Sequence, residues 1–178
     1  IILTMNEEVN ISKCIDSIAS VAKRIIVIDS GSTDNTVSIA KEKGADVYFN
    51  EFVDYATQFN WGLDNTGIET TWVLRIDADE RFTPALCEEV NKETECHQSD
   101  NVNGMLVKQK VFFINRWLLH GEVYPFQKLL IFKHGIGRIE NRKIDEHTIL
   151  TSGTTIELKH DAEHYAIKNI TNWIAKHN

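Results

Sequence analysis

The segment Trp72-Val73-Leu74-Arg75-Ile76-Asp77-Ala78-Asp79 decides the fold, because an apolar run here ends in two carboxylates one residue apart. A short apolar run is typical of a buried strand, which would place Asp77 and Asp79 at the carboxyl edge of a sheet. Open α/β sheets bind their ligands at that edge. Carboxylate oxygens suit Mg²⁺ or Mn²⁺ shared with a phosphate. The segment therefore predicts an enzyme that handles a nucleotide or another phosphate ester.

Strands and helices are predicted to alternate on both sides of this segment. Asn6 is a candidate N-cap for a helix whose apolar residues recur up to Ile18. Ser32 or Thr33 is the candidate cap of a second helix, and Gly44 fits its C-terminus. Such alternation gives a parallel sheet with right-handed crossovers. The predicted strands are 1–4, 24–28, 45–49 and 72–76, and the remaining predicted helices are 55–63 and one that begins at Thr83-Pro84.

The pattern changes after about Asn101, where strands are predicted without regular helices between them. Residues 104–113, 128–133 and 154–159 have strand character, which indicates a mixed, partly antiparallel second half. A final amphipathic helix is predicted around 167–174. We expect a single domain over residues 1–178, with a nucleotide-side half at 1–100 and an acceptor-side half at 101–178. The chain opens inside a strand and stops inside a helical pattern, so we expect truncation at both ends.

Composition narrows the class of protein. The 178 residues carry a net charge of −7, which argues against broad nucleic-acid binding. No apolar run approaches the ~18 residues that a membrane-spanning helix needs, and no signal peptide is visible. The three cysteines show no CxxC spacing, which favours reduced thiols in a cytosolic protein over disulfides or a zinc site.

The acidic cluster permits more than one interpretation from the residues alone. Asp77, Asp79 and Glu80 repel one another unless they are solvated or bound to a metal ion. A phosphatase of the haloacid-dehalogenase type also places two such aspartates after a strand, but it expects Thr or Val where this chain has Arg81. Asp29, at the end of an earlier strand, is placed to contact a base or ribose, and is equally a candidate turn aspartate.

Three ordered motifs resemble the signatures of family 2 glycosyltransferases with the GT-A fold. They are Thr4-Met5-Asn6-Glu7-Glu8, the segment from Val27 to Thr36, and the segment from Trp72 to Glu80. The second half resembles, more loosely, the bacterial branch that contains the lipopolysaccharide-core β-glucosyltransferases. That looser match rests on 115–121, 128–133, Asp145-Glu146-His147 and Lys176-His177-Asn178.

The resemblance implies a role for each matching residue on the donor side. Thr4 and Glu7 would contact the base and ribose of a nucleotide-sugar donor, and Asp29 would hold the base. Asp77 would lie near the ribose or the sugar. Asp79 would ligate a Mg²⁺ or Mn²⁺ ion that bridges the diphosphate.

The acceptor side is less defined by the resemblance. Inverting members need a general base, and Glu146 is the first choice because 144–146 falls where the branch carries a hydrophobic-His-Glu triplet. The family's histidine is replaced here by Asp145, which stays a competitor for the same role. His160 is the first choice for a further metal ligand, ahead of three other histidines. Candidates to pair with phosphate or an acceptor anion are Lys128, Arg138 and Arg142. Trp117 is a candidate to stack on a sugar. The other three histidines with a possible role are His120, His147 and His164.

The resemblance thus implies an inverting, metal-dependent transferase that moves a hexose from a nucleotide sugar, with a UDP-hexose such as UDP-glucose favoured. Its acceptor would be lipopolysaccharide, capsule or another surface or lipid-linked glycan. Two alternatives stay open: a catalytically silent nucleotide- or glycan-binding domain, and a sugar-1-phosphate nucleotidyltransferase, which would need a glycine-rich opening that this chain lacks. The expected location is the cytoplasm or the inner face of its membrane, since 168–176 would pack on the sheet or lie on a membrane surface.

Overall fold

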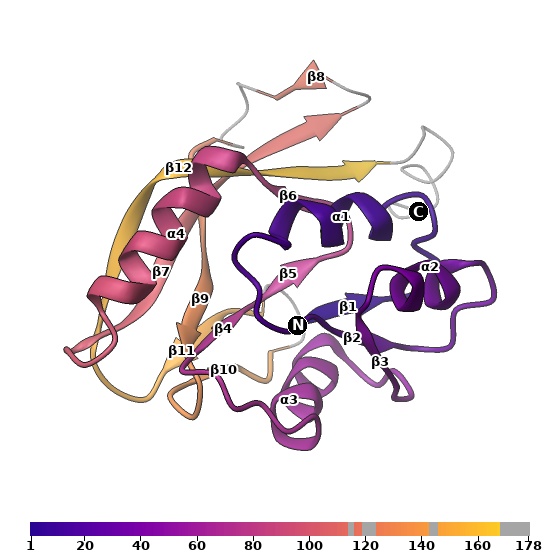
Figure 1. The fold of residues 1–178 in the computed structure, drawn as a ribbon, viewed down its shortest axis with the longest axis horizontal. Helices are drawn as coiled ribbons and strands as arrows, with labels where there is room; N and C mark the ends of the chain where they lie inside the picture. The colour runs from indigo at the N-terminus through magenta and orange to yellow at the C-terminus, as the bar shows by residue number, and fades with distance from the viewer. Residues whose placement is uncertain (114–115, 119–123, 143–145, 168–178) are drawn as a thin grey trace.

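The computed structural model describes residues 1–113, 116–118, 124–142 and 146–167. The predicted terminal helix lies outside these residues. A four-stranded parallel sheet, here sheet A, has the order β3-β2-β1-β5 (Figure 1). Its strands are β1 (Ile2–Thr4), β2 (Ile26–Asp29), β3 (Asp46–Phe49) and β5 (Ile76–Asp77).

The register of sheet A aligns the ends of three strands. Thr4 lies beside Asp29, and Leu3 lies beside Asp77. The side chains predicted from separate motifs therefore reach one edge of one sheet, as the parallel topology requires. This confirms the expected α/β class for the first half of the chain.

Helices cover both faces of sheet A. The predicted alternation is confirmed by α1 (Ile11–Ile18), α2 (Thr36–Glu42) and α3 (Tyr55–Asn65). The apolar faces of α1 and α2 pack in one core cluster with Ile2 and Val27, whereas α3 packs in a second cluster with Leu3 (Figure 1). Alternate residues of β1 thus serve opposite layers, as the two-residue period of a strand dictates.

The predicted helix caps at Asn6 and at Ser32 or Thr33 are wrong. Asn6 has a φ of 56°, and α1 begins only after Asn10. The two loops bond to each other instead: the Asn6 amide donates to Ser32 Oγ, and the Thr33 amide donates to Asn6 Oδ1. The capping side chains are used in a tertiary contact between loops, which sequence spacing does not reveal. Gly44, by contrast, follows α2 with a φ of 81°, as its predicted position demands.

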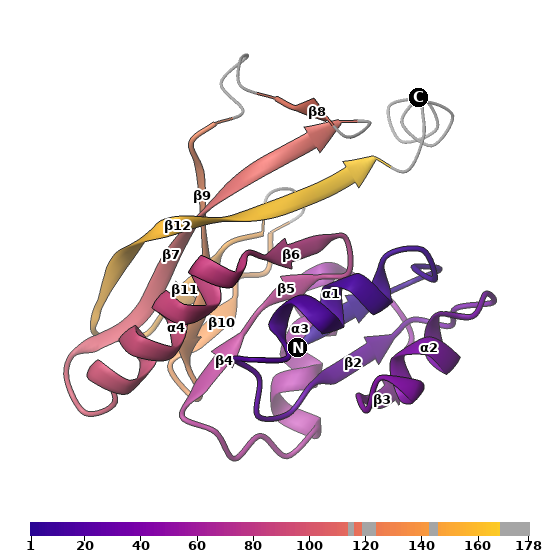
Figure 2. The ribbon, with the colours of Figure 1, turned by 45° about the horizontal axis from the view of Figure 1, so that its top comes forward.

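The second half forms a mixed sheet, here sheet B, with the order β4-β9-β7-β12-β6 (Figure 2). The long neighbours β7 and β12 run parallel, and the other pairs of the sheet are antiparallel. Helix α4 (Pro84–Cys96) packs on β12, and its predicted cap, Thr83, accepts a hydrogen bond from the Leu86 amide. The strands are β4 (Trp72–Leu74), β6 (Glu80–Phe82), β7 (Val102–Phe113), β9 (Phe126–Lys133) and β12 (Thr154–Ile167), with β8 (Arg116–Trp117) beside β7 and a separate ribbon of β10 (Gly137–Ile139) and β11 (Thr148–Leu150).

The segment from Trp72 to Asp79 departs from the single parallel strand predicted for it. Its first part, β4, pairs antiparallel with β9 in sheet B, and its last part, β5, pairs with β1 in sheet A. The chain changes sheets at Arg75, whose amide donates to the Leu130 carbonyl, while the next amide, of Ile76, donates to the Ile1 carbonyl. The acidic motif therefore lies where the two sheets meet.

Candidate active site

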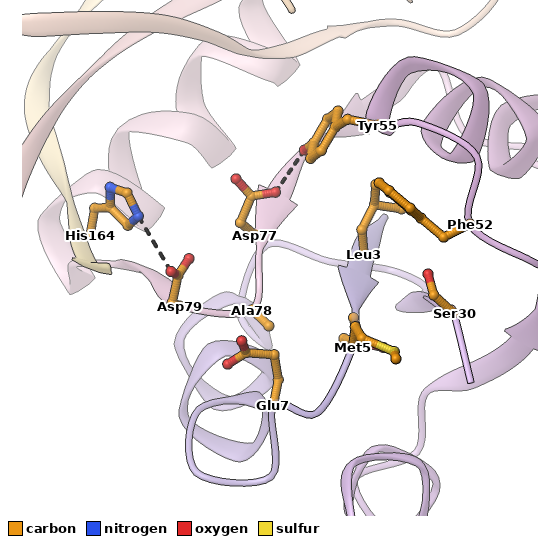
Figure 3. A pocket seen from close by; sticks show the side chains of 11 residues that line it. Leu3, Met5, Glu7, Ser30, Phe52, Tyr55, Asp77, Ala78, Asp79 and His164 are labelled. Atoms are coloured by element: carbon orange, nitrogen blue, oxygen red, sulfur yellow. Dashed lines mark hydrogen bonds and ion pairs between the residues drawn. The ribbon is translucent and has the colours of Figure 1, made fainter. Parts of the chain in front are cut away.

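A pocket of about 490 Å³ opens at the carboxyl edge of sheet A (Figure 3). Both aspartates of the acidic motif line it, and so does His164 from β12 of sheet B. The pocket is thus built by both sheets. Its lining residues are Leu3, Thr4, Met5, Glu7, Ser30, Phe52, Tyr55, Asp77, Ala78, Asp79 and His164.

Asp77 lies at the end of β5 and is held by a tyrosine. The Tyr55 hydroxyl donates to Asp77 Oδ1 at 2.6 Å. Burial raises the pKa of Asp77, and the charge of Glu80 raises it further, against the opposing charge of Lys128. Burial and the Asp77 charge likewise raise the pKa of Tyr55 well above its usual value, so Tyr55 keeps its proton at neutral pH.

Asp79 and His164 lie next to each other in the lining of the pocket. Nε2 of His164 lies 3.4 Å from Oδ2 of Asp79 (Figure 3). Burial alone would raise the pKa of Asp79, but the hydrogen bond and charge of His164 hold it below the usual value. Burial alone would lower the pKa of His164, yet Asp79 and Glu80 together raise it. Each group of the pair therefore favours the charged form of the other.

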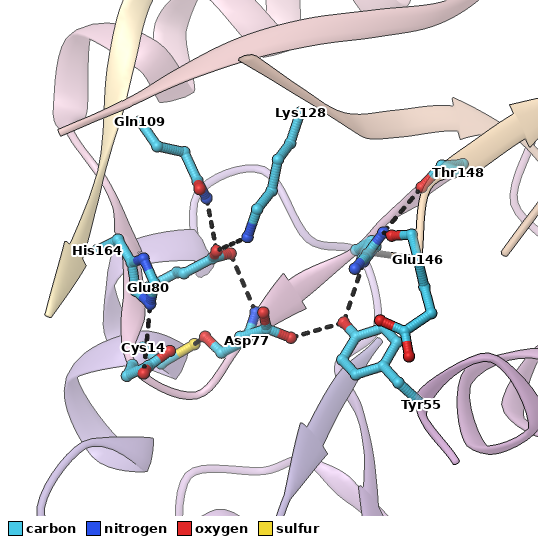
Figure 4. Close-up of polar contacts among 11 residues, drawn as sticks. Cys14, Tyr55, Asp77, Glu80, Gln109, Lys128, Glu146, Thr148 and His164 are labelled. Atoms are coloured by element: carbon cyan, nitrogen blue, oxygen red, sulfur yellow. Dashed lines mark hydrogen bonds and ion pairs between the residues drawn. The ribbon is translucent and has the colours of Figure 1, made fainter. Parts of the chain in front are cut away.

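Behind the pocket, Glu80 is enclosed by donors from sheet B (Figure 4). Its Oε1 accepts from Gln109 Nε2 and from Lys128 Nζ, the latter at 3.0 Å, and its Oε2 accepts from the Asp77 amide. Burial alone would lower the pKa of Lys128, but Glu80 and Asp77 raise it above its usual value. Lys128, predicted as a contact for a ligand anion, instead neutralises the protein's own carboxylates.

The residues predicted to hold the base have different surroundings. Thr4 and Glu7 both line the pocket. Asp29 does not: it is buried, and its carboxylate accepts from the amides of Gly31 and Ser32 and from the Thr4 hydroxyl. The structure therefore shows Asp29 in the turn role that the sequence left open. Its contact with a base stays a prediction.

Glu146, the first choice for the base, lies beside the pocket and not among its lining residues. Its carbonyl accepts a 3.4 Å hydrogen bond from Arg75, and Arg75 also donates to Tyr55. Glu146 is therefore linked to the Asp77 side of the pocket through two side chains (Figure 4). Asp145 lies outside the described residues, so the choice between the two carboxylates stays a prediction.

The structure does not bring His160 to Asp79. His160 lies at the edge of α4, where its Nδ1 is 2.8 Å from Glu89 Oε2. Between Glu157 and Asp161, β12 bulges relative to β7, with four residue steps opposite two. After the bulge, His164 pairs with Glu80 of β6 and reaches the pocket. The sequence prediction ended this strand at residue 159, so it ranked His160 ahead of His164, which the longer strand brings to the pocket.

Other sequence candidates lie away from the pocket, in surface ion pairs. Arg138 pairs with Asp64 at 2.6 Å. Arg142 and His147 each pair with Glu140. Trp117 is partly exposed, with the Lys110 ammonium 4.9 Å from its ring centroid, and His120 lies outside the described residues.

Met5, Phe52 and Tyr55 are among the lining residues that were not predicted as site residues. Met5 and Phe52 are more than half exposed, and give the open side of the pocket an apolar wall. From the sequence, Tyr55 is predicted only to be the first residue of a helix. The burial and the partners that make it part of the site come from the distant segments around Arg75 and Asp77.

The comparison with protein families agrees with the motifs. The model of glycosyl transferase family 2 matches residues 1–158. The chain belongs to glycosyl transferase family 2. The match includes all three motifs of the first half and the strands that build the pocket up to β12. It confirms the family resemblance drawn from the sequence.

Curated relatives in this family include glycosyltransferases of bacteria. The lipopolysaccharide core biosynthesis glycosyltransferase LpsC of Rhizobium meliloti is 30% identical over 151 residues, which cover 82% of this chain and 54% of LpsC. An uncharacterized glycosyltransferase of Rickettsia typhi is 33% identical over 112 residues, which cover 63% of this chain and 38% of that protein. The chain thus spans 38% to 54% of the length of these two relatives.

A solved structure shares the fold of this family 2 chain. The crystal structure of S. aureus TarS 1-349 superposes with a TM-score of 0.51 at 15% identity, covering 75% of this chain and 45% of that chain. The GT-A architecture, with its mostly parallel sheet and mixed second half, is confirmed. Within the described residues, no helix combines the length and the apolar content that crossing a bilayer would require.

The donor atoms of the pocket fit a divalent cation that shares its ligands with a phosphate. Among the described residues, no three His, Cys, Asp or Glu side chains form a ready metal cage. Mg²⁺ and Mn²⁺ accept such sites, because they take few protein ligands and complete their shell with phosphate and water oxygens. Asp79 offers carboxylate oxygens at the pocket, and His164 offers an imidazole nitrogen beside it. In this family 2 chain, these two are the residues that would hold the ion.

Proposed function

We propose that this protein is an inverting glycosyltransferase that moves a hexose from a nucleotide sugar, with a UDP-hexose favoured, to a surface or lipid-linked glycan. The observation that carries the proposal is the pocket itself, where Asp77 and Asp79 meet Thr4 and Glu7 at one sheet edge. Family membership supports transfer chemistry, and the likeness to LpsC supports a lipopolysaccharide-type acceptor.

In the proposed reaction, each group of pocket residues has a different role. Thr4 and Glu7 bind the base and ribose, and Asp77 orients the ribose or the sugar. Asp79 and His164 hold the cation, Mg²⁺ or Mn²⁺, which would supply charge against the leaving diphosphate. Glu146, or its neighbour Asp145, takes the proton from the acceptor hydroxyl as that oxygen attacks the anomeric carbon from the face opposite the diphosphate.

One observation favours a second candidate, nucleotide-sugar binding without transfer. The carboxylate proposed as the base, on Glu146, is not among the side chains that line the pocket. Binding without turnover in an intact protein would favour this second candidate, whereas release of nucleoside diphosphate in the presence of an acceptor glycan would exclude it.

The test is a thermal-shift screen of nucleotide sugars with and without Mn²⁺, on the wild type and on Asp79→Asn. A ligand at 100 times its Kd stabilises the folded state by about 2.7 kcal/mol, which is readily measured as a rise in Tm. We expect a rise in wild type that depends on Mn²⁺, and loss of its Mn²⁺-dependent part in Asp79→Asn.

The matched control is Asp64→Asn, which removes a carboxylate that pairs with Arg138 on the surface. It should keep the full Mn²⁺-dependent rise. The proposed donor site is wrong if no nucleotide sugar raises Tm. The proposed metal role of Asp79 is wrong if Asp79→Asn behaves like Asp64→Asn.

A further inference from the structure

Arg75 is buried at the point where the chain changes sheets, and its side chain contacts two separate segments. Only 7% of its surface is exposed. Its Nε donates to the Tyr55 hydroxyl oxygen at 3.0 Å, and its guanidinium carbon lies 4.6 Å from the centre of the Tyr55 ring. A second nitrogen donates to Thr148 Oγ1 at 3.2 Å and to the Glu146 carbonyl at 3.4 Å. One cation thus joins the start of α3 to the start of β11.

The direction of the hydrogen bonds in this group is fixed by chemistry. A guanidinium can only donate, so the Tyr55 oxygen must accept from Arg75. The Tyr55 proton is then available for one acceptor, and Asp77 Oδ1 lies 2.6 Å away. An ionised carboxylate can only accept. With Asp77 ionised, the chain from Arg75 through Tyr55 to Asp77 therefore has a single arrangement of protons, and it holds one oxygen of Asp77 in place.

We propose that Arg75 and Tyr55 are positioning residues that fix the orientation of the Asp77 carboxylate toward the donor and link it to the segment of Glu146 and Thr148. The inference rests on the proposed function in that Asp77 contacts the nucleotide sugar. It adds that the donor side and the acceptor side are joined by a buried guanidinium, so that a disturbance at Thr148 reaches Asp77.

The first test is Tyr55→Phe, which removes the hydroxyl and keeps the ring that packs on Arg75. The control is Tyr48→Phe, since Tyr48 also bonds an arginine, Arg24, but on the exposed side of β3. The affinity for the nucleotide sugar that gives the largest shift in the screen above is measured by calorimetry with Mn²⁺. We expect a loss of about tenfold in Tyr55→Phe, the order of one hydrogen bond to a charged group, and less than twofold in Tyr48→Phe.

The second test asks whether the link to β11 exists. Thr148→Val removes the hydroxyl that Arg75 contacts, and Thr151→Val removes a hydroxyl that bonds the Ile136 carbonyl outside the site. If Arg75 transmits the constraint, the effects of Thr148→Val and Tyr55→Phe on donor affinity differ from additivity by about threefold or more. Additive effects, or an equal effect of Thr151→Val, overturn the link.

A readout without any ligand separates this inference from the proposed function. The Nε–H signal of Arg75, assigned by its loss in Arg75→Lys, should exchange slowly with solvent in wild type and in Tyr48→Phe, and rapidly in Tyr55→Phe. Rapid exchange in wild type overturns the inference even if nucleotide sugars bind. If exchange is slow but no nucleotide sugar binds, the contact of Arg75 with Tyr55 that holds Asp77 is supported. The proposed function, and with it the role of Asp77 in contacting the donor, is then overturned. Wild-type donor affinity in Tyr55→Phe overturns the positioning role.

Discussion

At the scale of single residues, the site has to accommodate three acidic side chains that repel one another. Asp77, Asp79 and Glu80 lie within four positions, and each meets a different partner. Asp77 meets a neutral hydroxyl, Asp79 a histidine and Glu80 a lysine. The three carboxylates therefore differ in what they can bind. Glu80 is buried and bonded to Lys128 and Gln109, whereas Asp77 and Asp79 line the pocket, where a ligand can reach them.

Glu80→Gln should destabilise the fold, because it removes the buried carboxylate that pairs directly with Lys128 and leaves it with Asp77 as a counter-charge nearby. The Glu80 side chain is 1% exposed and the Lys128 side chain 23% exposed, so solvent screens the lysine only in part. Relief of the repulsion with Asp77 offsets some of the loss. We expect a cost of about 2 kcal/mol in the free energy of unfolding, measured by urea denaturation, below the range for fully buried pairs.

Glu157→Gln is the matched control for that substitution. Glu157 also accepts from a glutamine, Gln127, but on the exposed face of β12. Its substitution should change the free energy of unfolding by less than about 0.5 kcal/mol, as for most surface positions. Equal costs for the two variants would show that the buried pair of Glu80 and Lys128 contributes nothing specific.

The positions of site residues could be predicted from the sequence where one motif contains them. Asp77 and Asp79 were predicted as strand-end carboxylates, and they line one pocket. His160 was ranked ahead of His164, the histidine that lies beside Asp79, because a bulge in β12 decides which of the two reaches it. Bulges depend on the neighbouring strand, so the spacing of the histidines in the sequence carries no such information.

At the scale of elements, a capping residue in the sequence predicts the start of a helix only where its side chain is not bonded to another loop. Thr83 and Pro84 start α4 as predicted, because the Thr83 hydroxyl meets only its own helix and the Asp161 carbonyl. Asn6, Ser32 and Thr33 have the same capping chemistry, yet they bond across two loops. The apolar residues of 72–76 likewise predict a strand. They do not reveal that the strand pairs with β9 before Arg75 and with β1 after it.

Thr83→Ala should therefore weaken α4. The substitution leaves the Leu86 amide without its acceptor, and loss of such a cap costs about 1–2 kcal/mol. Thr94→Ala is the control within the same helix: its hydroxyl bonds the Val90 and Asn91 carbonyls of the preceding turn, and alanine is the better helix former. We expect Thr94→Ala to stay within about 0.5 kcal/mol of wild type. A cost for Thr94→Ala as large as that for Thr83→Ala would contradict the capping role.

At the scale of the whole molecule, one core serves both sheets. Ile2 and Val27 of sheet A belong to the same buried cluster as Met105 and Val107 of sheet B. The chain also passes directly from sheet B into sheet A at Arg75. The pocket therefore takes its lining from both predicted halves of the chain. The division into a donor-side half and an acceptor-side half stays a prediction.

This shared core predicts that the two sheets unfold together. Met105→Ala removes a fully buried side chain from β7, at an expected cost of about 2–5 kcal/mol. In native-state hydrogen exchange, the most protected amides of β2 should lose as much protection as those of β7, because both exchange only through global unfolding. The reciprocal variant, Val27→Ala in β2, should lower the protection of β9 by as much as that of β2. If Met105→Ala leaves the protection of β2 unchanged, the sheets are separate folding units, and the single domain predicted for the chain is wrong.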